Sequence, residues 1–97
     1  MEEVFKDGSI VRHFKRDADN HGSKYLYLFL GTARHTETDE VFAIYRELYG
    51  AGRLHARPLK SFYDLVDRNI HPESIQDRRF ELATNEEIEY VKNAGLI

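Results

Sequence analysis

The sequence contains no cysteine, no tryptophan and no long uninterrupted run of apolar residues. The absence of cysteine excludes disulfides, thiolate metal ligands and thiol catalysis. No apolar run approaches the roughly 18 residues that a membrane span requires. The first residues, MEEVFKDGS, are acidic and lack the basic and then apolar pattern of a secretory signal. We therefore expect a cytoplasmic protein without a membrane partner.

What is present fits one small globular domain. The 97 residues are 41% hydrophobic and 32% charged, which is an ordinary composition for a folded chain. A chain of this length forms one domain, here residues 1–97, and buries about two thirds of its unfolded surface. Six Tyr and six Phe supply the apolar surface for one core. There is no internal repeat, linker or low-complexity tract.

Charge is distributed unevenly along the chain. The formal net charge is −3, which disfavours non-specific attraction to a nucleic-acid backbone. Acidic residues dominate both ends of the sequence. Basic residues gather early and in the middle, at Arg12, His13, Lys15, Arg16, Arg34, Arg46, Arg53 and Arg57. A local basic surface is therefore compatible with an acidic chain.

Alternation and β-branched or aromatic content predict most of the strands. We expect strands at 9–14, 24–33, 41–49, 54–57 and 79–83. Gly31 predicts a bend or bulge inside the second strand. The segment 41–49 also fits a helix, because Val41, Ile44, Tyr45 and Leu48 recur at helical spacing. A strand is favoured there, since the glycine pair at 50 and 52 closes the segment as a turn.

The remaining segments predict turns and helices. The stretch 16–22, RDADNHG, reads as a turn or mobile loop, and 35–40 as a hairpin turn. After Pro58, residues 59–66 fit a single helical turn or another short strand. Pro72 followed by Glu73 predicts a short helix at 71–76. The clearest helix is 85–94, capped by Thr84 or Asn85 and ended by Gly95.

Five short segments carry a family resemblance. They are VRHFK at 11–15, ARHTET at 33–38, IYRELYG at 44–50, RPLKSF at 57–62 and RRFEL at 78–82. In this order and spacing they resemble the domain of unknown function 1653, a family of small bacterial and phage proteins. The resemblance runs from about residue 10 to residue 82 and implies a barrel-like β domain with no established activity.

The sequence departs from the family pattern at three places. The loop 16–23 is longer than the usual turn, the C-terminal helix extends beyond the domain, and His55 stands where an aromatic residue such as Trp or Tyr is common. With the resemblance, we predict a mainly β fold with a C-terminal helix. It is a small, SH3-like, partly open β-barrel of about five strands plus a short helix, with its β core at 10–82.

The leading candidate site is an anion site of arginine, histidine and tyrosine side chains. Arginine presents a rigid fork of donors that suits phosphate or carboxylate, and Tyr and His can hydrogen-bond or stack on a ring. The predicted ligand-binding residues are Arg34, His35, Arg46 and Arg57, with Arg12, His13 and Tyr49 nearby. The alternative is that these arginines form cross-strand ion pairs with Glu37, Asp39, Glu40 and Glu47.

Other kinds of site are less favoured. His13, His35 and His55 have no metal-ligand spacing, so we predict no metal site and no cofactor. Acid and base chemistry by His35 with Glu37 or Thr36 lacks any recognised motif, and we predict no catalytic residues. The segment ARHTET more simply shapes a turn, with Thr36 and Thr38 bonding the backbone. The aromatic residues are expected in the core rather than on a base-stacking surface.

The sequence therefore predicts a non-catalytic binding module for a small anionic, nucleotide-like ligand. Sequestration of such a ligand is one use that the occurrence of the family in phages suggests. The alternative is a protein-interaction module that uses a strand edge or the C-terminal helix, through Ile88 and Val91. The third hypothesis is a small hydrolase-like enzyme. Nucleic acid is a disfavoured partner, whereas a protein partner or a homo-oligomer is left open.

Overall fold

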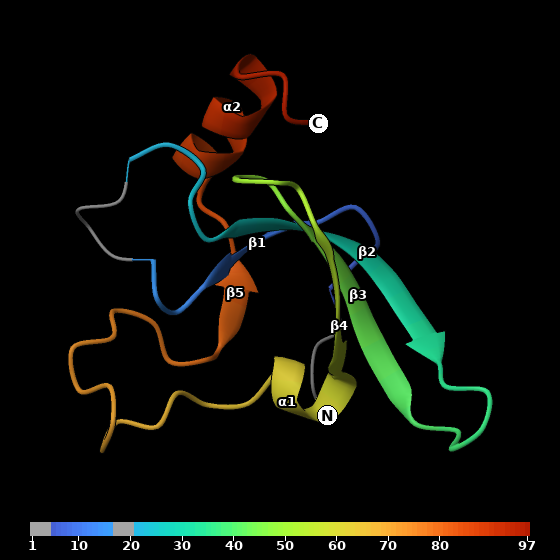
Figure 1. The fold of residues 1–97 in the computed structure, drawn as a ribbon. Helices are drawn as coiled ribbons and strands as arrows, with labels where there is room; N and C mark the ends of the chain where they lie inside the picture. Colours follow the sequence, from blue (N-terminus) through green and yellow to red (C-terminus); the bar gives the residue numbers. More distant parts are fainter. Residues whose placement is uncertain (1–4, 17–20) are drawn as a thin grey trace.

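The computed structural model describes residues 5–16 and 21–97. In this part of the chain five strands precede the C-terminal helix, and a short helix lies between the last two strands (Figure 1). The elements are β1 (Ile10–His13), β2 (Leu26–Arg34), β3 (Val41–Glu47), β4 (Leu54–Pro58), α1 (Leu59–Phe62), β5 (Phe80–Leu82) and α2 (Asn85–Asn93).

All five strands belong to one antiparallel sheet with the order β4-β3-β2-β1-β5. Strands β1 to β4 form a meander, and β5 returns to pair with β1. This confirms the predicted mainly β fold with about five strands, a short helix and a C-terminal helix. The outer strands β4 and β5 do not pair with each other, so the sheet is open along that side.

The sheet is nevertheless strongly curled. Tyr45 on β3 and Phe80 on β5 have ring centroids 5.2 Å apart, although β2 and β1 lie between their strands. In a flat sheet these strands would stand roughly 14 Å apart, three spacings of about 4.8 Å. The curl gives the sheet a concave face, which carries Val11, His13, Tyr27, Phe29, Tyr45, His55, Arg57 and Phe80.

The predicted irregularity at Gly31 is confirmed. The register between β2 and β3 shifts between Phe29 and Gly31, as a bulge requires. Gly31 adopts φ 142°, and a Cβ added there would lie 3.3 Å from a carboxylate oxygen of Asp7. Glycine suits this position because it accepts the unusual φ and leaves room for the N-terminal segment.

Two clusters of buried residues pack on the two faces of the sheet, one on each face. The concave face is filled by an aromatic cluster that includes Tyr27, Phe29, Tyr45, Phe62, Tyr63 and Phe80. On the opposite face, called here the α2 face, Val91 of α2 packs against Ile10, Leu26, Leu48 and Ala83. Figure 1 shows α2 at the opposite end of the molecule from α1. The aromatic residues thus serve mainly as core, as predicted.

Helix α2 begins and ends with the side chains and glycine that the sequence indicates. The Thr84 hydroxyl accepts a hydrogen bond from the backbone N–H of Glu87, and the Glu87 carboxylate accepts one from the backbone N–H of Thr84. This reciprocal pair is a capping box. At the other end Gly95 has φ 72°, and the Leu96 N–H donates to the Val91 carbonyl. These contacts satisfy the terminal backbone groups of the helix.

The structure decides between the alternatives for two segments, and it shows that one predicted helix is wrong. Residues 41–47 form a strand, and residues 59–62 form the helical turn α1. The short helix expected at 71–76 is absent, and this segment is a series of turns. In a helix the Gln76 N–H would donate to the Pro72 carbonyl, whereas here it donates to the Ser74 hydroxyl, which in turn donates to the Gln76 carbonyl. The predicted loop 16–22 includes residues 17–20, which lie outside the described residues.

No helix in the described ranges is long and apolar enough to cross a membrane.

The capping box predicts the effect of a single substitution on stability. Thr84→Ala removes the acceptor for the Glu87 N–H and should lower the free energy of unfolding by about 1 kcal/mol. Urea denaturation of the wild type and the variant measures this difference. Thr36→Ala, in the exposed hairpin turn, is the matched control and should leave stability nearly unchanged. Equal stability of the Thr84 variant and the wild type would contradict the capping role.

Candidate functional site

The sheet register separates the predicted site residues onto two faces. Residues paired directly across an antiparallel ladder share a face, and neighbours along a strand alternate. Arg57 pairs with Ala43, and His55 pairs with Tyr45, so both side chains belong to the concave face. Arg46 follows Tyr45 and therefore lies on the α2 face. The predicted convergence of Arg46 and Arg57 on one site is thus wrong.

Arg12 also lies on the α2 face, where it has a structural partner. Its guanidinium is 3.4 Å from the carboxylate of Glu87, and Arg16 binds the same carboxylate. Burial alone would raise the pKa of Glu87, but the Thr84 N–H and the two arginines outweigh it, so the pKa is lowered. Arg16 additionally donates to the carbonyls of Gly22 and Lys24. Arg12 thus helps to fasten α2 to β1 and does not face the concave side.

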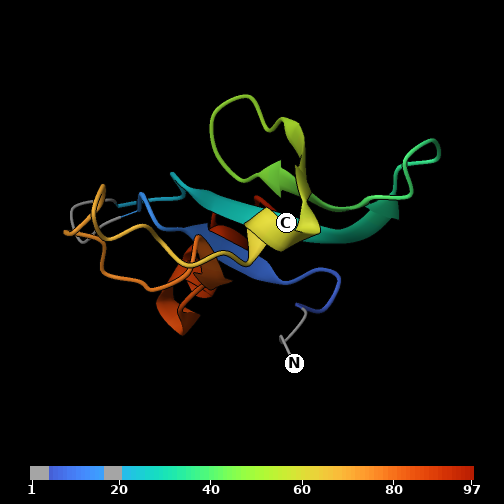
Figure 2. The same cartoon turned by 90° about the horizontal axis from the view of Figure 1, so that it is seen from below.

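Arg34 and His35 lie at the far end of the β2–β3 hairpin. Figures 1 and 2 both show this hairpin turn projecting from the rest of the molecule. Arg34 is 68% exposed and forms an ion pair with Asp39 at 2.9 Å. The His35 Nδ1 accepts hydrogen bonds from the N–H groups of Glu37 and Thr38. Here the ion-pair and turn-shaping alternatives hold, and neither residue reaches the other predicted site residues.

The remaining predicted residues, His13, Tyr49 and Arg57, are brought to the concave side. A chain of ring contacts connects two of them: His13 lies 6.0 Å from Tyr25 between centroids, and Tyr25 lies 5.9 Å from Tyr49. The Tyr49 ring also contacts Tyr27 at 5.5 Å. The sheet curl therefore assembles a smaller site than the sequence predicted, from three of its seven residues.

Two tyrosine hydroxyls meet on this side of the sheet. The Tyr27 and Tyr49 oxygens are 2.6 Å apart. Burial is the main cause that raises the pKa of each phenol, and the hydrogen bond with Tyr49 raises that of Tyr27 further. Both phenols therefore stay neutral near neutral pH and keep an O–H donor available between them.

His55 retains a flat ring at the position where the family commonly has an aromatic residue. Its imidazole stacks on Tyr45 with centroids 5.3 Å apart and planes 21° apart. Its Nε2 lies 2.7 Å from a carboxylate oxygen of Glu47, and the other oxygen accepts from the Arg53 N–H. These two hydrogen bonds, the one with His55 first, lower the pKa of Glu47. Both oxygens of the Glu47 carboxylate are thus already engaged in hydrogen bonds.

His13 lies within the electrostatic influence of several positively charged side chains. Its pKa is lowered from 6.5 to about 4, first by burial and then by the positive charges of Lys15, Arg79 and Arg57. None of the main influences on His13 comes from a carboxylate. We call Lys15, Arg57 and Arg79, together with the His13 whose pKa they lower, the cationic cluster. It joins residues of β1, β4 and β5 or their flanks.

The charges of the cationic cluster are not neutralised by the described residues. Lys15, Arg57 and Arg79 have no carboxylate oxygen within 4 Å among residues 5–16 and 21–97. Arg79 uses its Nε to bind the Ser61 carbonyl at 3.0 Å. The Arg57 Nε is buried and has no hydrogen-bond partner in the described part of the chain. Such groups are rare in folded proteins, because burying a polar group without a partner costs free energy.

Sequence reasoning missed Lys15 and Arg79 as members of this cluster. Both lie in segments that carried the family resemblance, VRHFK and RRFEL. The pairing of β1 with β5, His13 opposite Phe80, places these two segments side by side. That pairing joins residues nearly 70 positions apart, so only a correct strand order could have revealed it.

Among the described residues, no group of three His, Asp or Glu side chains could hold a metal ion. His35 lies at the hairpin turn, whereas His13 and His55 contact the core rings Phe80 and Tyr45.

The lowered pKa of His13 predicts a pH dependence of stability. Between pH 6.5 and about 4 the unfolded chain binds a proton on His13 that the folded protein does not bind. The free energy of unfolding should therefore decrease as the pH is lowered through this range. Urea denaturation at pH 7, 6 and 5 measures this slope, which should flatten in His13→Gln but not in the exposed control His21→Gln. In NMR, a His13 ring titration midpoint near 6.5 would contradict the burial of a neutral imidazole.

Comparison with known proteins identifies the family but not an activity. Neither a curated protein nor a solved structure matches the chain. The family described as "Protein of unknown function (DUF1653)" matches residues 9–82. This range begins just before β1 and ends with β5, so it contains the whole sheet and the cationic cluster. The chain therefore belongs to this family of proteins of unknown function.

Proposed function

We propose that the protein is a non-catalytic binding module for a small anionic, nucleotide-like ligand, held on the concave face by the cationic cluster. The observation that carries the proposal is that the positive charges of Lys15, Arg57 and Arg79 all act on His13, while none of the three has a carboxylate oxygen within 4 Å in the described part of the chain. Positive side chains brought together inside a fold repel one another, and an anion between them relieves that repulsion.

The donors of the cluster suit phosphate or carboxylate oxygens. Arginine binds such groups through two parallel N–H bonds, and lysine adds a mobile positive charge. His13 contributes as a neutral group: its Nδ1 accepts the Lys15 N–H at 3.1 Å, which leaves the ring proton on Nε2. The imidazole then offers a neutral donor beside the cations, as a partner for an oxygen of the ligand.

Aromatic side chains beside the cluster suit the planar part of a nucleotide-like ligand. Tyr25 and Tyr49 are both partly exposed, and their rings meet at 65° on the side of His13. Aromatic rings bind planar groups by stacking, with little dependence on the identity of the group. The hydroxyl pair of Tyr27 and Tyr49 adds a polar contact at the edge of this surface.

A binding role is favoured over catalysis by the surroundings of His35 and His13. His35, the residue considered for acid and base chemistry, is occupied by the backbone of the hairpin turn. His13 has no carboxylate among its main electrostatic neighbours to orient it as a general base. Binding without turnover is consistent with sequestration of the ligand.

A protein-interaction module is the alternative, and the free edges of β4 and β5 favour it. Leu54 at the start of β4 is 65% exposed, and an unpaired strand edge can accept a strand from another chain. The C-terminal helix is a weaker candidate, because Val91 is fully buried and Ile88 packs in the same cluster on the α2 face. The anion site is preferred because it explains the unpaired charges.

The proposal predicts which arginine matters for binding. Titration calorimetry should detect binding of at least one of pyrophosphate, ribose 5-phosphate and the four ribonucleoside 5′-monophosphates to the wild-type protein. Arg57→Gln should weaken that binding about tenfold or more, because charge-assisted hydrogen bonds are lost. Arg34→Gln is the matched control, since Arg34 is exposed and paired with Asp39, and it should bind as the wild type does.

Circular dichroism spectra of both variants establish that they are folded. The proposal is overturned if the wild type binds none of these six compounds, or if Arg57→Gln binds as tightly as the wild type. Equal weakening by Arg34→Gln would show a general effect of net charge and would also count against a defined site.

A further inference from the structure

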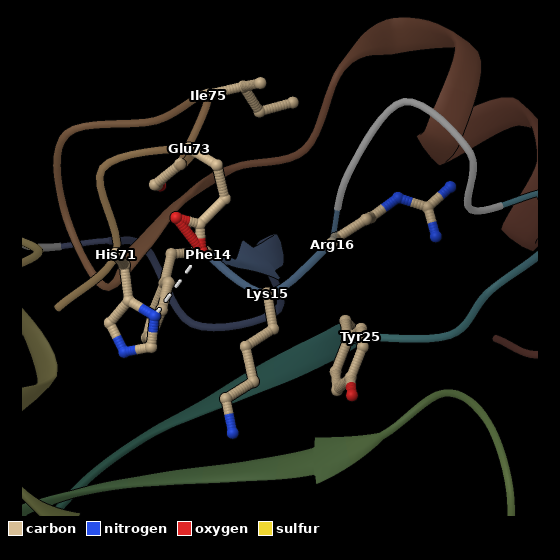
Figure 3. Close-up of a pocket in the computed structure, with 8 residues that line it drawn as sticks. Phe14, Lys15, Arg16, Tyr25, His71, Glu73 and Ile75 are labelled. Atoms are coloured by element: carbon tan, nitrogen blue, oxygen red, sulfur yellow. Dashed lines mark ion pairs between the residues drawn. The ribbon is translucent and has the colours of Figure 1, made fainter.

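A cavity of about 340 Å³ lies next to the cationic cluster. It is formed by residues 14–16 after β1, by Tyr25 before β2, and by the loop 71–75 (Figure 3). The volume is within the range of small-molecule sites, about 300 to 1,000 Å³. Figure 3 shows the Arg16 guanidinium directed away from His71 and the Lys15 amine, consistent with its bond to Glu87.

Aromatic rings stand on two sides of this cavity. Phe14 and His71 contact each other with centroids 4.8 Å apart, and Figure 3 shows the partly exposed Tyr25 ring on the other side of the Lys15 side chain. Tyr25 has φ 66°, a conformation that bulky residues rarely adopt and that persists only where the surroundings fix it. Its carbonyl accepts the His13 N–H at 3.0 Å, which holds this conformation against β1. The walls are suited to a flat ring.

The charged side chains that line the cavity favour one orientation of the ligand. Glu73 pairs with His71 at 3.7 Å, whereas the Lys15 side chain runs away from Glu73 with its amine at the other end in Figure 3. A phosphate group would be repelled by Glu73 and attracted by Lys15. An uncharged ring therefore fits the end near Glu73, and the anionic part of the same ligand belongs toward Lys15.

The cavity and the cationic cluster are adjacent, because two residues belong to both surroundings. Lys15 and His71 line the cavity, and both act electrostatically on His13, as do Arg57 and Arg79. A ligand in the cavity would thus have Lys15 of the cationic cluster beside it.

From this arrangement we infer that the ligand is a nucleoside phosphate whose base enters the cavity between His71 and Tyr25, while its phosphate lies at Lys15 and Arg57. This inference rests on the proposed function and adds the chemical class and the orientation of the ligand. It requires that the base contributes to affinity, since stacking on aromatic rings favours binding of each base.

Calorimetry with the four ribonucleoside 5′-monophosphates and with ribose 5-phosphate tests the inference. At least one nucleotide should bind the wild type about tenfold more tightly than ribose 5-phosphate. His71→Ala removes one wall and should reduce this preference severalfold while leaving the affinity for ribose 5-phosphate unchanged. His71→Phe keeps a flat ring and should retain the preference. The loop position of His71, outside both core clusters, favours folding of both variants.

The outcomes separate the two proposals. If ribose 5-phosphate and the nucleotides bind equally, or if His71→Ala keeps the full preference for the nucleotide, the base does not occupy the cavity, and only this inference is overturned. If neither ribose 5-phosphate nor any nucleotide binds the wild type, both this inference and the nucleotide-like character of the proposed function fail.

Discussion

The Tyr45 ring, in a residue only 5% exposed, contacts four rings from four different elements: Tyr27 on β2, His55 on β4, Phe62 on α1 and Phe80 on β5. Phe62 and Phe80 are themselves stacked, with centroids 4.3 Å apart. These contacts draw the two halves of the sheet together, because a flat sheet would keep β3 and β5 far apart. The open, curled sheet is therefore held by side chains where backbone pairing is missing.

The curl decides which positive charges meet. On the α2 face, Arg12 and Arg16 share the carboxylate of Glu87, so those charges fasten the C-terminal helix to the sheet. On the concave face, Arg57 of β4 is brought within electrostatic reach of His13 on β1, and no described acid accompanies it. Charges of the first kind are paired within the fold, whereas those of the second kind have no carboxylate partner among the described residues and are the basis of the proposed anion site.

The sequence predicts the elements of this protein better than it predicts the site. Strong alternation, Gly31 and the Thr84 cap are local signals, and the structure confirms the strands, the bulge and the helix that they indicate. The helix expected after Pro72 is absent, and the Ser74 hydroxyl there bonds the Gln76 backbone, a local alternative to the helical hydrogen bonds. The predicted site is also wrong in part. Arg46 lies on the α2 face because neighbours along a strand alternate between faces. The segments of Lys15 and Arg79 lie side by side only because β1 pairs with β5, which is far away in the sequence.

The most direct test of the account concerns the ring contacts that curl the sheet. Nuclear Overhauser measurements on the protein in solution should show contacts between the ring protons of Tyr45 and those of Phe80, whose strands are separated by β2 and β1. Such contacts would place β3 across from β5, as the curl of the sheet requires. If Tyr45 contacts only its neighbours on β2 and β4, the sheet is flat, and Arg57 and His13 are too far apart to form a common site.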